Sequence, residues 1–172
     1  MRGWGGTKGP AILALLLLLP VFSAPAACLP PPRGEVLLRV SGAIGCTNLG
    51  GEARFDLALL ESLGVARLVT RTPWTEGEGT FEGVTARRLL DAVRARGGTV
   101  RAIALNDYET EIPVEELVRH EVLIAWKRDG RRLRRRGKGP LWIVYPWSEH
   151  PELDTRLVRQ HSVWQLDRLV IR

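Results

Sequence analysis

The apolar runs in this sequence are short, and turn-forming residues separate them. Alternating apolar and polar residues predict β-strands, because successive side chains of a strand point to opposite faces. More continuous apolar runs predict strands that are buried on both faces. Asn106-Asp107 and Asp129-Gly130 are typical of tight turns between such strands. The predicted strands are 35–40, 66–70, 99–105, 109–112, 122–126, 141–145 and 164–171.

Three short helices are expected between these strands. Asp56 is a predicted N-cap for a helix over 57–63, which Gly64 ends. Thr85 opens a second helix, which places Leu89, Leu90 and Val93 on one face, and Pro113 starts a third that runs to Val118. Six to eight strands with two or three helices favour an α+β protein with a mixed β core, rather than an alternating βαβ sheet.

The first 27 residues have the pattern of a secretory signal. Arg2 and Lys8 are positive, an apolar run follows from Ala11 to Phe22, and small residues stand at 23–27. The run is shorter than the roughly 20 apolar residues of a membrane span, so we expect cleavage after Ala26 or Ala27 and no membrane span. The expected organisation is a signal peptide at 1–27, a linker at 28–34 and one domain at 35–172, located in the periplasm or otherwise exported.

Only two cysteines are present, Cys28 and Cys46. A bacterial lipoprotein signal also ends in a cysteine, and a lipid on Cys28 would tether the domain to a membrane. Pro25 stands where such signals usually carry Leu, which argues against lipidation. An oxidising compartment would instead permit a bridge between Cys28 and Cys46. The sequence leaves the lipidated, bridged and free states open.

The formal net charge is +6, and arginine supplies most of the positive charge. A basic exported domain favours an anionic ligand or surface, and we expect no nucleic-acid partner outside the cytoplasm. The densest basic run is 131–138, where arginines could hold a phosphate or carboxylate through paired hydrogen bonds. The alternative is a solvated hairpin arm, which is the usual state of such a run.

No catalytic or metal-binding motif stands out by its spacing. The sequence has no C-x-x-C, H-E-x-x-H, P-loop or G-x-S-x-G pattern. His120, His150 and His161 are far apart, and we expect ordinary surface or core roles for them rather than metal ligation.

Two loops are candidate functional segments. The polar segment 71–79 contains Trp74 and follows a strand, and 106–108 carries the phenol of Tyr108. We expect Trp126, Trp142 and Trp164 in the core, whereas Trp74 and Trp147 lie beside prolines and are better placed to line a cleft. Ordinary capped turns are the alternative for both loops.

Taken in order, these segments resemble the molybdopterin-binding domain of the sulfite oxidase and methionine-sulfoxide-reductase catalytic-subunit family. No single segment is specific, but the ordered set is. The segments that carry the resemblance are Leu38–Gly42, Phe55-Asp56-Leu57, Trp74, Phe81-Glu82-Gly83-Val84, Leu89-Leu90, Asn106-Asp107-Tyr108, Ile112-Pro113-Val114, Val122–Ala125, Asp129-Gly130, Gly139–Pro146 and Val163–Leu166.

The resemblance implies a sulfite-oxidase-type fold with a molybdopterin cofactor in a groove. It also implies two-electron redox chemistry on a small substrate, in which metal and pterin react and the protein orients them. Tyr108 is the implied catalytic residue. The candidate cofactor-binding residues are Thr70, Arg71, Thr72, Trp74, Asp107 and Lys138.

The chain departs from the family at the groups that hold the metal. A family cysteine binds molybdenum just before the Trp-Gly-Val region, but 69–74 contains no cysteine, and Thr is no substitute for a thiolate. Trp142 and Val163 stand where the family has Arg and Lys. We therefore expect no metal ligand in this chain.

Three functions follow as hypotheses. The chain is a small exported oxidoreductase with a molybdopterin-type cofactor and a redox partner protein. Alternatively, it is a non-catalytic module that holds an anionic small molecule or a partner protein in the same groove without molybdenum. The third hypothesis is a structural domain with an empty groove.

Overall fold

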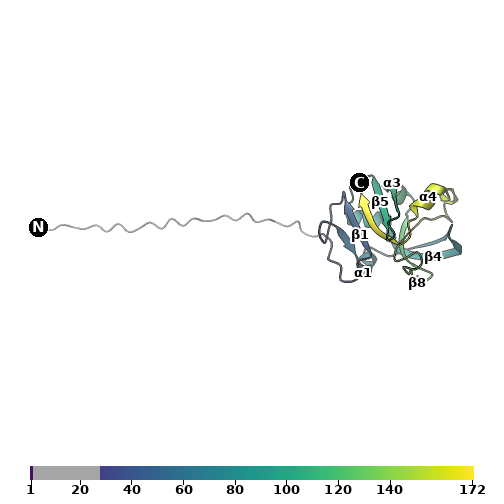
Figure 1. Cartoon of the computed structure of the whole chain (residues 1–172), viewed down its shortest axis with the longest axis horizontal. Helices are drawn as coiled ribbons and strands as arrows, with labels where there is room; N and C mark the ends of the chain where they lie inside the picture. Colours follow the sequence, from purple (N-terminus) through teal and green to yellow (C-terminus); the bar gives the residue numbers. More distant parts are fainter. Residues whose placement is uncertain (2–27) are drawn as a thin grey trace.

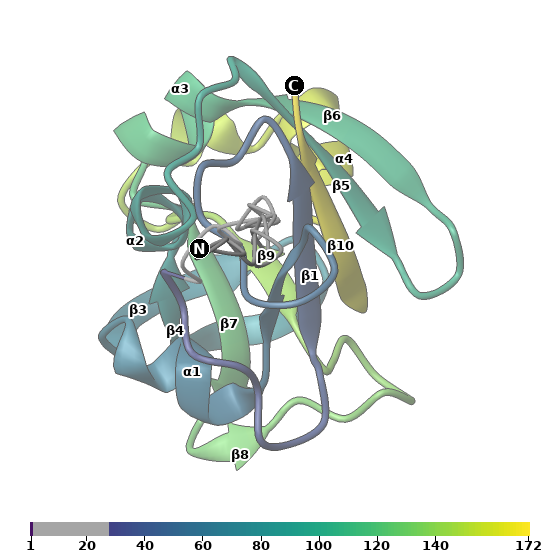
Figure 2. The same cartoon turned by 90° about the vertical axis from the view of Figure 1, so that its left-hand side faces the viewer.

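The structure is a computed structural model that describes Met1 and residues 28–172. The predicted signal segment, apart from Met1, lies outside the described residues. Two five-stranded sheets form the domain (Figures 1 and 2). No helix in the described part is both long and apolar enough to cross a membrane.

The first sheet joins the two ends of the domain. Its strands follow the order β2-β1-β10-β5-β6, and β1 and β10 are parallel while the other neighbours are antiparallel. Gly42 ends β1 at a φ of +89°, and a Cβ there would lie 2.1 Å from the carbonyl oxygen of Ile171, so only glycine fits. The strands are β1 (Leu38–Gly42), β2 (Ala53–Phe55), β5 (Thr99–Ala104), β6 (Glu109–Pro113) and β10 (Leu166–Ile171).

The second sheet is antiparallel and follows the order β3-β4-β7-β8, with β9 also paired to β7. β7 and β9 are the buried strands that the apolar runs predicted, and they bring Trp126 and Trp142 into the core. The strands are β3 (Ala66–Thr72), β4 (Thr75–Thr85), β7 (Leu123–Arg128), β8 (Arg131–Arg132) and β9 (Trp142–Val144).

Four α-helices and one 3₁₀ turn complete the domain. Asp56 and Thr85 cap α1 and α2 as predicted, since their side chains accept hydrogen bonds from the backbone N–H groups of Leu59 and Arg88. The elements are α1 (Leu57–Ser62), α2 (Ala86–Ala92), α3 (Val114–Arg119), η1 (Pro151–Leu153) and α4 (Arg156–His161).

The segment 28–34 is fastened to the domain at several points. Cys28 forms a disulfide with Cys46, and their Cα atoms are 5.5 Å apart. One carboxylate oxygen of Asp56 accepts hydrogen bonds from the backbone N–H groups of Arg33 (2.7 Å) and Gly34 (2.8 Å). Burial by itself would raise the pKa of Asp56, but the backbone N–H groups around it lower that pKa below its ordinary value. The acid therefore links the predicted linker to the start of α1.

Several expectations about local structure differ from the structure. The segment 71–79, expected as a loop, is a β3–β4 hairpin that turns at 72–75. Trp147, expected at a cleft, is only 2% exposed and packs in the core, and it also lines a space of about 190 Å³ together with Arg71 and Thr72. The number of strands is also higher than expected, because β2 and β8 are too short to leave an alternating pattern, and α4 was not anticipated.

Candidate functional site

A cavity of about 610 Å³ is lined by α4, the residues that flank it, and the β3–β4 and β5–β6 turns. The β3–β4 turn contributes Trp74, the β5–β6 turn contributes Asn106 and Tyr108, and the residues after α4 contribute Trp164. We call this space the α4 cavity. Its lining residues are Trp74, Ala104, Asn106, Tyr108, Asp154, Arg156, Arg159, Gln160, Ser162 and Trp164.

Tryptophan rings form one wall of the α4 cavity. The ring centroids of Trp74 and Trp164 are 5.2 Å apart at 86°, and Trp74 also meets Trp142 and Trp147 edge to face. Such contacts fix the ring planes, because each edge is held against the face of a neighbour. Trp164 was expected in the core, but it is half-buried and reaches the cavity. The wall offers fixed aromatic surfaces on which a flat ligand can stack.

Lys138 supports this wall from the other side. Its Nζ lies 3.6 Å from the ring centroid of Trp164, 5.1 Å from that of Trp142 and 5.4 Å from that of Trp74. An ammonium group over ring faces is attracted by their negative quadrupole, while burial lowers the pKa of Lys138. Lys138 was predicted to bind a cofactor. It does not line the α4 cavity, and its ammonium instead holds the three rings together.

Tyr108 occupies the edge of the cavity. Its hydroxyl donates a hydrogen bond to the carbonyl oxygen of Gln160 in α4, at 3.0 Å, and its backbone N–H donates to the side-chain oxygen of Asn106. Burial raises the pKa of Tyr108, so the phenol is a neutral hydrogen-bond donor at neutral pH. The β5–β6 turn and α4 are thus joined at the cavity through a single phenol.

A second part of the cavity lining, which we call the basic wall, comes from α4. Arg156 and Arg159 project from α4, and Arg159 pairs with Asp154, its Nε lying 2.7 Å from a carboxylate oxygen. The hydrogen bond from Arg159 lowers the pKa of Asp154. Among the described residues, Arg156 has no ion-pair partner within 4.0 Å. This wall was missed because α4 was not predicted, although Thr155 is the N-cap signal that could have marked it.

A buried hydrogen-bond network positions α4. One carboxylate oxygen of Glu116 accepts hydrogen bonds from the hydroxyl of Tyr145 (2.6 Å) and from Nδ1 of His161 (2.8 Å). Burial opposes the charged form of Glu116, but the bonds from His161 and Tyr145 outweigh it and lower the pKa of Glu116. Burial and the bond to Glu116 raise the pKa of Tyr145. His161 therefore has a structural role, as expected for the three histidines.

Three further candidate residues lie beside the α4 cavity rather than in it. Arg71 and Thr72 line a neighbouring space of about 190 Å³ that shares Asp154 with the α4 cavity. The hydroxyl of Thr72 pairs with that of Thr75 at 2.8 Å and accepts from the N–H of Trp74, so it closes the hairpin turn. Thr70 is fully buried, and its hydroxyl accepts from the N–H of Ser148. The Thr70 and Thr72 hydroxyls are thus engaged within the protein.

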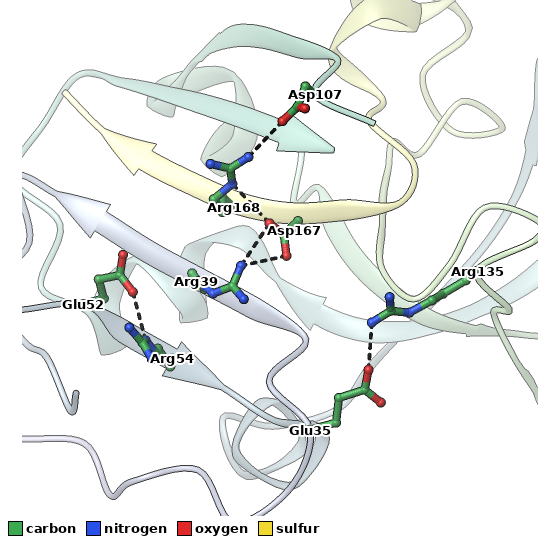
Figure 3. A network of polar contacts seen from close by, with 8 residues as sticks. All are labelled: Glu35, Arg39, Glu52, Arg54, Asp107, Arg135, Asp167 and Arg168. Atoms are coloured by element: carbon green, nitrogen blue, oxygen red, sulfur yellow. Dashed lines mark hydrogen bonds and ion pairs between the residues drawn. The ribbon is translucent and has the colours of Figure 1, made fainter. Parts of the chain in front are cut away.

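Asp107 does not line the α4 cavity, contrary to the prediction. Its side chain is 86% exposed, and an oxygen of it lies 3.1 Å from the guanidinium of Arg168. Figure 3 shows this contact at the edge of a chain of ion pairs that continues through Asp167 to Arg39. At a φ of +61°, Asp107 shapes the turn and leaves Asn106 and Tyr108 to reach the cavity.

The site does not fit a molybdenum ion held through protein sulfur. The chain's two cysteines are joined in a disulfide, and none of the lining residues is a cysteine. Among the described residues, no group of three or more His, Cys, Asp and Glu side chains could hold a metal ion. The organic part of a pterin cofactor does fit, since flat aromatic walls and two arginines suit a planar ring with an anionic tail.

Comparison with protein families gives a match to the oxidoreductase molybdopterin binding domain over residues 57–150. The chain belongs to this family. The matched segment contains Trp74 and Tyr108 but ends before α4, so the basic wall lies beyond it. The family and the sulfite-oxidase-type α+β fold are both as the sequence predicted.

The fold is similar to that of the sulfane dehydrogenase SoxCD from Paracoccus pantotrophus, with a TM-score of 0.57 and 16% sequence identity. The similarity covers 78% of this chain but only 37% of the SoxCD chain. At this identity, it supports the fold alone. Comparison with curated protein sequences gives no match.

Proposed function

We propose that this domain binds a planar, anionic small molecule of the pterin type in the α4 cavity, without a metal ligand from its own sulfur. The observation that carries the proposal is that aromatic rings and arginines line one cavity of about 610 Å³. Trp74 and Trp164 offer ring faces, and Arg156 and Arg159 offer guanidinium groups. Arginine matches phosphate and carboxylate groups through two parallel hydrogen bonds.

A fluorescence titration with 6-carboxypterin tests the proposal, because the tryptophans of the cavity report on the bound ring. We expect the R156Q/R159Q variant to bind about tenfold more weakly, and W164L to lose affinity by a similar factor. R94Q/R96Q is the control, since both residues are exposed and lie outside the α4 cavity. Equal loss in the control, or no loss in either cavity variant, would contradict the proposal.

Metal analysis of the purified protein tests the second half of the proposal. We expect no molybdenum–sulfur bond from the polypeptide, because Cys28 and Cys46 are paired with each other. X-ray absorption at the molybdenum edge of protein from its native compartment reports this directly. Stoichiometric molybdenum bound through a cysteine sulfur would overturn the assignment.

A small oxidoreductase is the second candidate, because the family is one of molybdopterin-binding oxidoreductases and Tyr108 lies at the cavity. In that case Tyr108 would donate a hydrogen bond or a proton to the substrate, and a redox partner protein would carry the electrons. The Y108F variant should then lose most of its turnover. Unchanged turnover in Y108F would remove Tyr108 from the catalytic role.

We also propose that the chain is exported to the periplasm or an equivalent compartment. The signal-like pattern at 1–27 and the Cys28–Cys46 disulfide support this, since disulfides persist in oxidising compartments. A thioether-linked lipid requires the same Sγ of Cys28, so the lipid anchor and the disulfide exclude each other. Intact mass spectrometry of the protein from the periplasmic and membrane fractions distinguishes cleavage after residue 26 or 27, the bridged form and a lipidated form.

A further inference from the structure

We propose a second binding site, separate from the α4 cavity, for an anion that carries two or more phosphate groups. The site is formed by the arginine arm, defined as residues 131–138, which begins at β8. Figures 1 and 2 show β8 at the lower edge of the domain and α4 near its upper edge. The tryptophan rings lie between the two cavities, since Lys138 lines the arm cavity and its Nζ is 3.6 Å from the ring centroid of Trp164, which lines the α4 cavity. A cavity of about 310 Å³ lies along the arm.

Five cationic side chains line this arm cavity, and no carboxylate is among its lining residues. The ring of Trp142 supplies an apolar surface at the same place. Like charges held this close repel one another, so the free cavity has a strongly positive potential. A bound polyanion would remove this repulsion. The cationic lining residues are Arg128, Arg131, Arg132, Arg134 and Lys138.

The arm differs from its surroundings in how its charges are paired. Most arginines elsewhere in the described domain have an acidic partner, such as Arg39, whose guanidinium lies 3.1 Å from Asp167 (Figure 3). Within the arm, Arg135 pairs with Glu35 at 2.7 Å and does not line the arm cavity. Within the part of the chain that the structure describes, Arg131, Arg132 and Arg134 have no acid within 4.0 Å, and neither does Lys138. Arg131, Arg132 and Arg134 are therefore available to an external anion, whereas the ammonium of Lys138 lies over the tryptophan rings.

Hydrogen bonds hold the backbone of the arm in place, which fixes the positions from which its arginine side chains extend. The N–H of Leu133 donates to the carbonyl oxygen of Trp126 at 2.9 Å, which attaches the start of the arm to β7. The N–H groups of Gly137 and Gly139 both donate to the carbonyl oxygen of Arg134, and the side-chain amide of Gln165 donates to the carbonyl oxygen of Arg135. A preorganised frame reduces the entropy that is lost when a ligand binds.

The arrangement favours phosphate groups over a single carboxylate. Guanidinium groups bind phosphate oxygens in pairs, and several cations around one cavity neutralise several negative charges. Two sources present this chemistry, namely a free oligophosphate and the head groups of an anionic lipid surface. Neither needs the α4 cavity, so this proposal does not depend on the proposed pterin-type ligand.

Isothermal titration of the full chain with inorganic pyrophosphate tests the site. We expect pyrophosphate to bind about tenfold more tightly than orthophosphate, and its affinity to fall as salt rises. The R131Q/R132Q/R134Q variant should lose more than about tenfold in affinity, since each exchange removes a charge-assisted contact. These side chains are exposed, so the variant should keep the wild-type circular dichroism spectrum and unfolding midpoint.

The R33Q/R94Q/R96Q variant is the charge-matched control, because it removes three exposed arginines that do not line the arm cavity, and it should bind pyrophosphate within about twofold of wild type. Equal weakening in this control would overturn the site, because it would show a response to net charge alone. The R156Q/R159Q variant should also keep pyrophosphate affinity, which separates a failure of this site from a failure of the α4 cavity.

Vesicle binding distinguishes the two sources of phosphate. Retention on phosphatidylglycerol vesicles but not on phosphatidylcholine vesicles, with release by pyrophosphate, would assign the arm to a lipid surface. Pyrophosphate binding without vesicle retention would assign it to a free oligophosphate. If neither pyrophosphate nor phosphatidylglycerol binds at low salt, the proposal is wrong.

Discussion

The α4 cavity and the arm cavity are both proposed to bind an anion, but different kinds of residue line them. Under α4, tryptophan rings face two arginines, and Asp154 balances one of these charges. On the arm, no carboxylate lines the cavity, and Arg131, Arg132 and Arg134 have no acidic partner within the described residues. The first arrangement selects for the shape of the ligand as well as for its charge, whereas the second selects mainly for charge density. Five measurements test or refine this contrast.

Removal of the Glu116 carboxylate should have the largest effect on stability. In E116A the hydroxyl of Tyr145 and Nδ1 of His161 lose their shared partner, so we expect a loss of about 3 kcal/mol in the free energy of unfolding. Urea denaturation measures it. E115A is the control, because Glu115 is exposed and makes only a surface pair with Arg119. An E116A loss no larger than that of E115A would show that α4 is held by other contacts.

Loss of the disulfide should come next. The C28S/C46S variant removes a cross-link over 18 residues of separation, and we expect about 2–3 kcal/mol lower stability from the freer unfolded chain. Thermal melts measure this loss. Wild type with reductant should be destabilised as much as the C28S/C46S variant, relative to wild type without reductant. Binding of 6-carboxypterin and of pyrophosphate should be unchanged, and weakened binding at either cavity would mean that the segment 28–34 also shapes that cavity.

Acid should lower the free energy of unfolding by protonating Glu116, which holds α4 in place. Its pKa in the folded protein lies below the ordinary value of 4.5, so the stabilisation is complete above that ordinary value and is lost as the pH falls through the folded pKa. The E116Q variant should lose less stability than wild type over this range. Amide hydrogen exchange, measured above pH 4.5 and again at a pH below the folded pKa of Glu116, compares the loss of protection in α4 with that in the arm. Equal acid sensitivity of wild type and E116Q would remove Glu116 from this role.

Removal of the N-cap of α4 should weaken ligand binding in the α4 cavity but not in the arm cavity. Thr155 accepts a hydrogen bond from the N–H of Val158 at 3.2 Å, so T155A should cost about 1 kcal/mol and loosen the arginines of α4. We expect weaker 6-carboxypterin binding and unchanged pyrophosphate binding. T155S, which keeps the hydroxyl, should restore both stability and affinity. If both ligands weaken together in T155A, the two cavities are coupled.

The smallest effect is expected at Asp107. Its pair with Arg168 is solvent-exposed, so D107N should change stability by less than about 0.5 kcal/mol and leave 6-carboxypterin affinity unaltered. A loss of affinity comparable to that of R156Q/R159Q would return Asp107 to the ligand site.

Local signals predicted most of the fold. The caps at Asp56 and Thr85, the turn at Asp129-Gly130 and the buried runs of β7 and β9 are each set by neighbouring residues, and each was predicted correctly. The β3–β4 hairpin was hidden by its glycines and by a turn that the hydroxyls of Thr72 and Thr75 close. α4 was hidden because only Val158 and His161 in it are buried, which leaves no apolar periodicity.

The candidate site was only half visible in the sequence. Trp74 and Tyr108 were chosen because they stand in polar turns, and both line the α4 cavity. Lys138 was predicted to bind a cofactor because it belongs to the basic run 131–138. Its ammonium packs against three tryptophans instead, and these contacts join distant segments that no local pattern encodes. Arg156 and Arg159 were missed together with the helix that carries them.

The position of β10 between β1 and β5 has a consequence for how the domain is made. Arg39 and Asp167 meet across this sheet although 128 residues separate them. Because β10 lies between β1 and β5, a growing chain cannot complete this sheet until β10 has been synthesised. Contacts between residues so far apart in sequence slow folding. The polypeptide should therefore stay unfolded until β10 has been synthesised. Removal of β10 should abolish folding rather than shorten the domain.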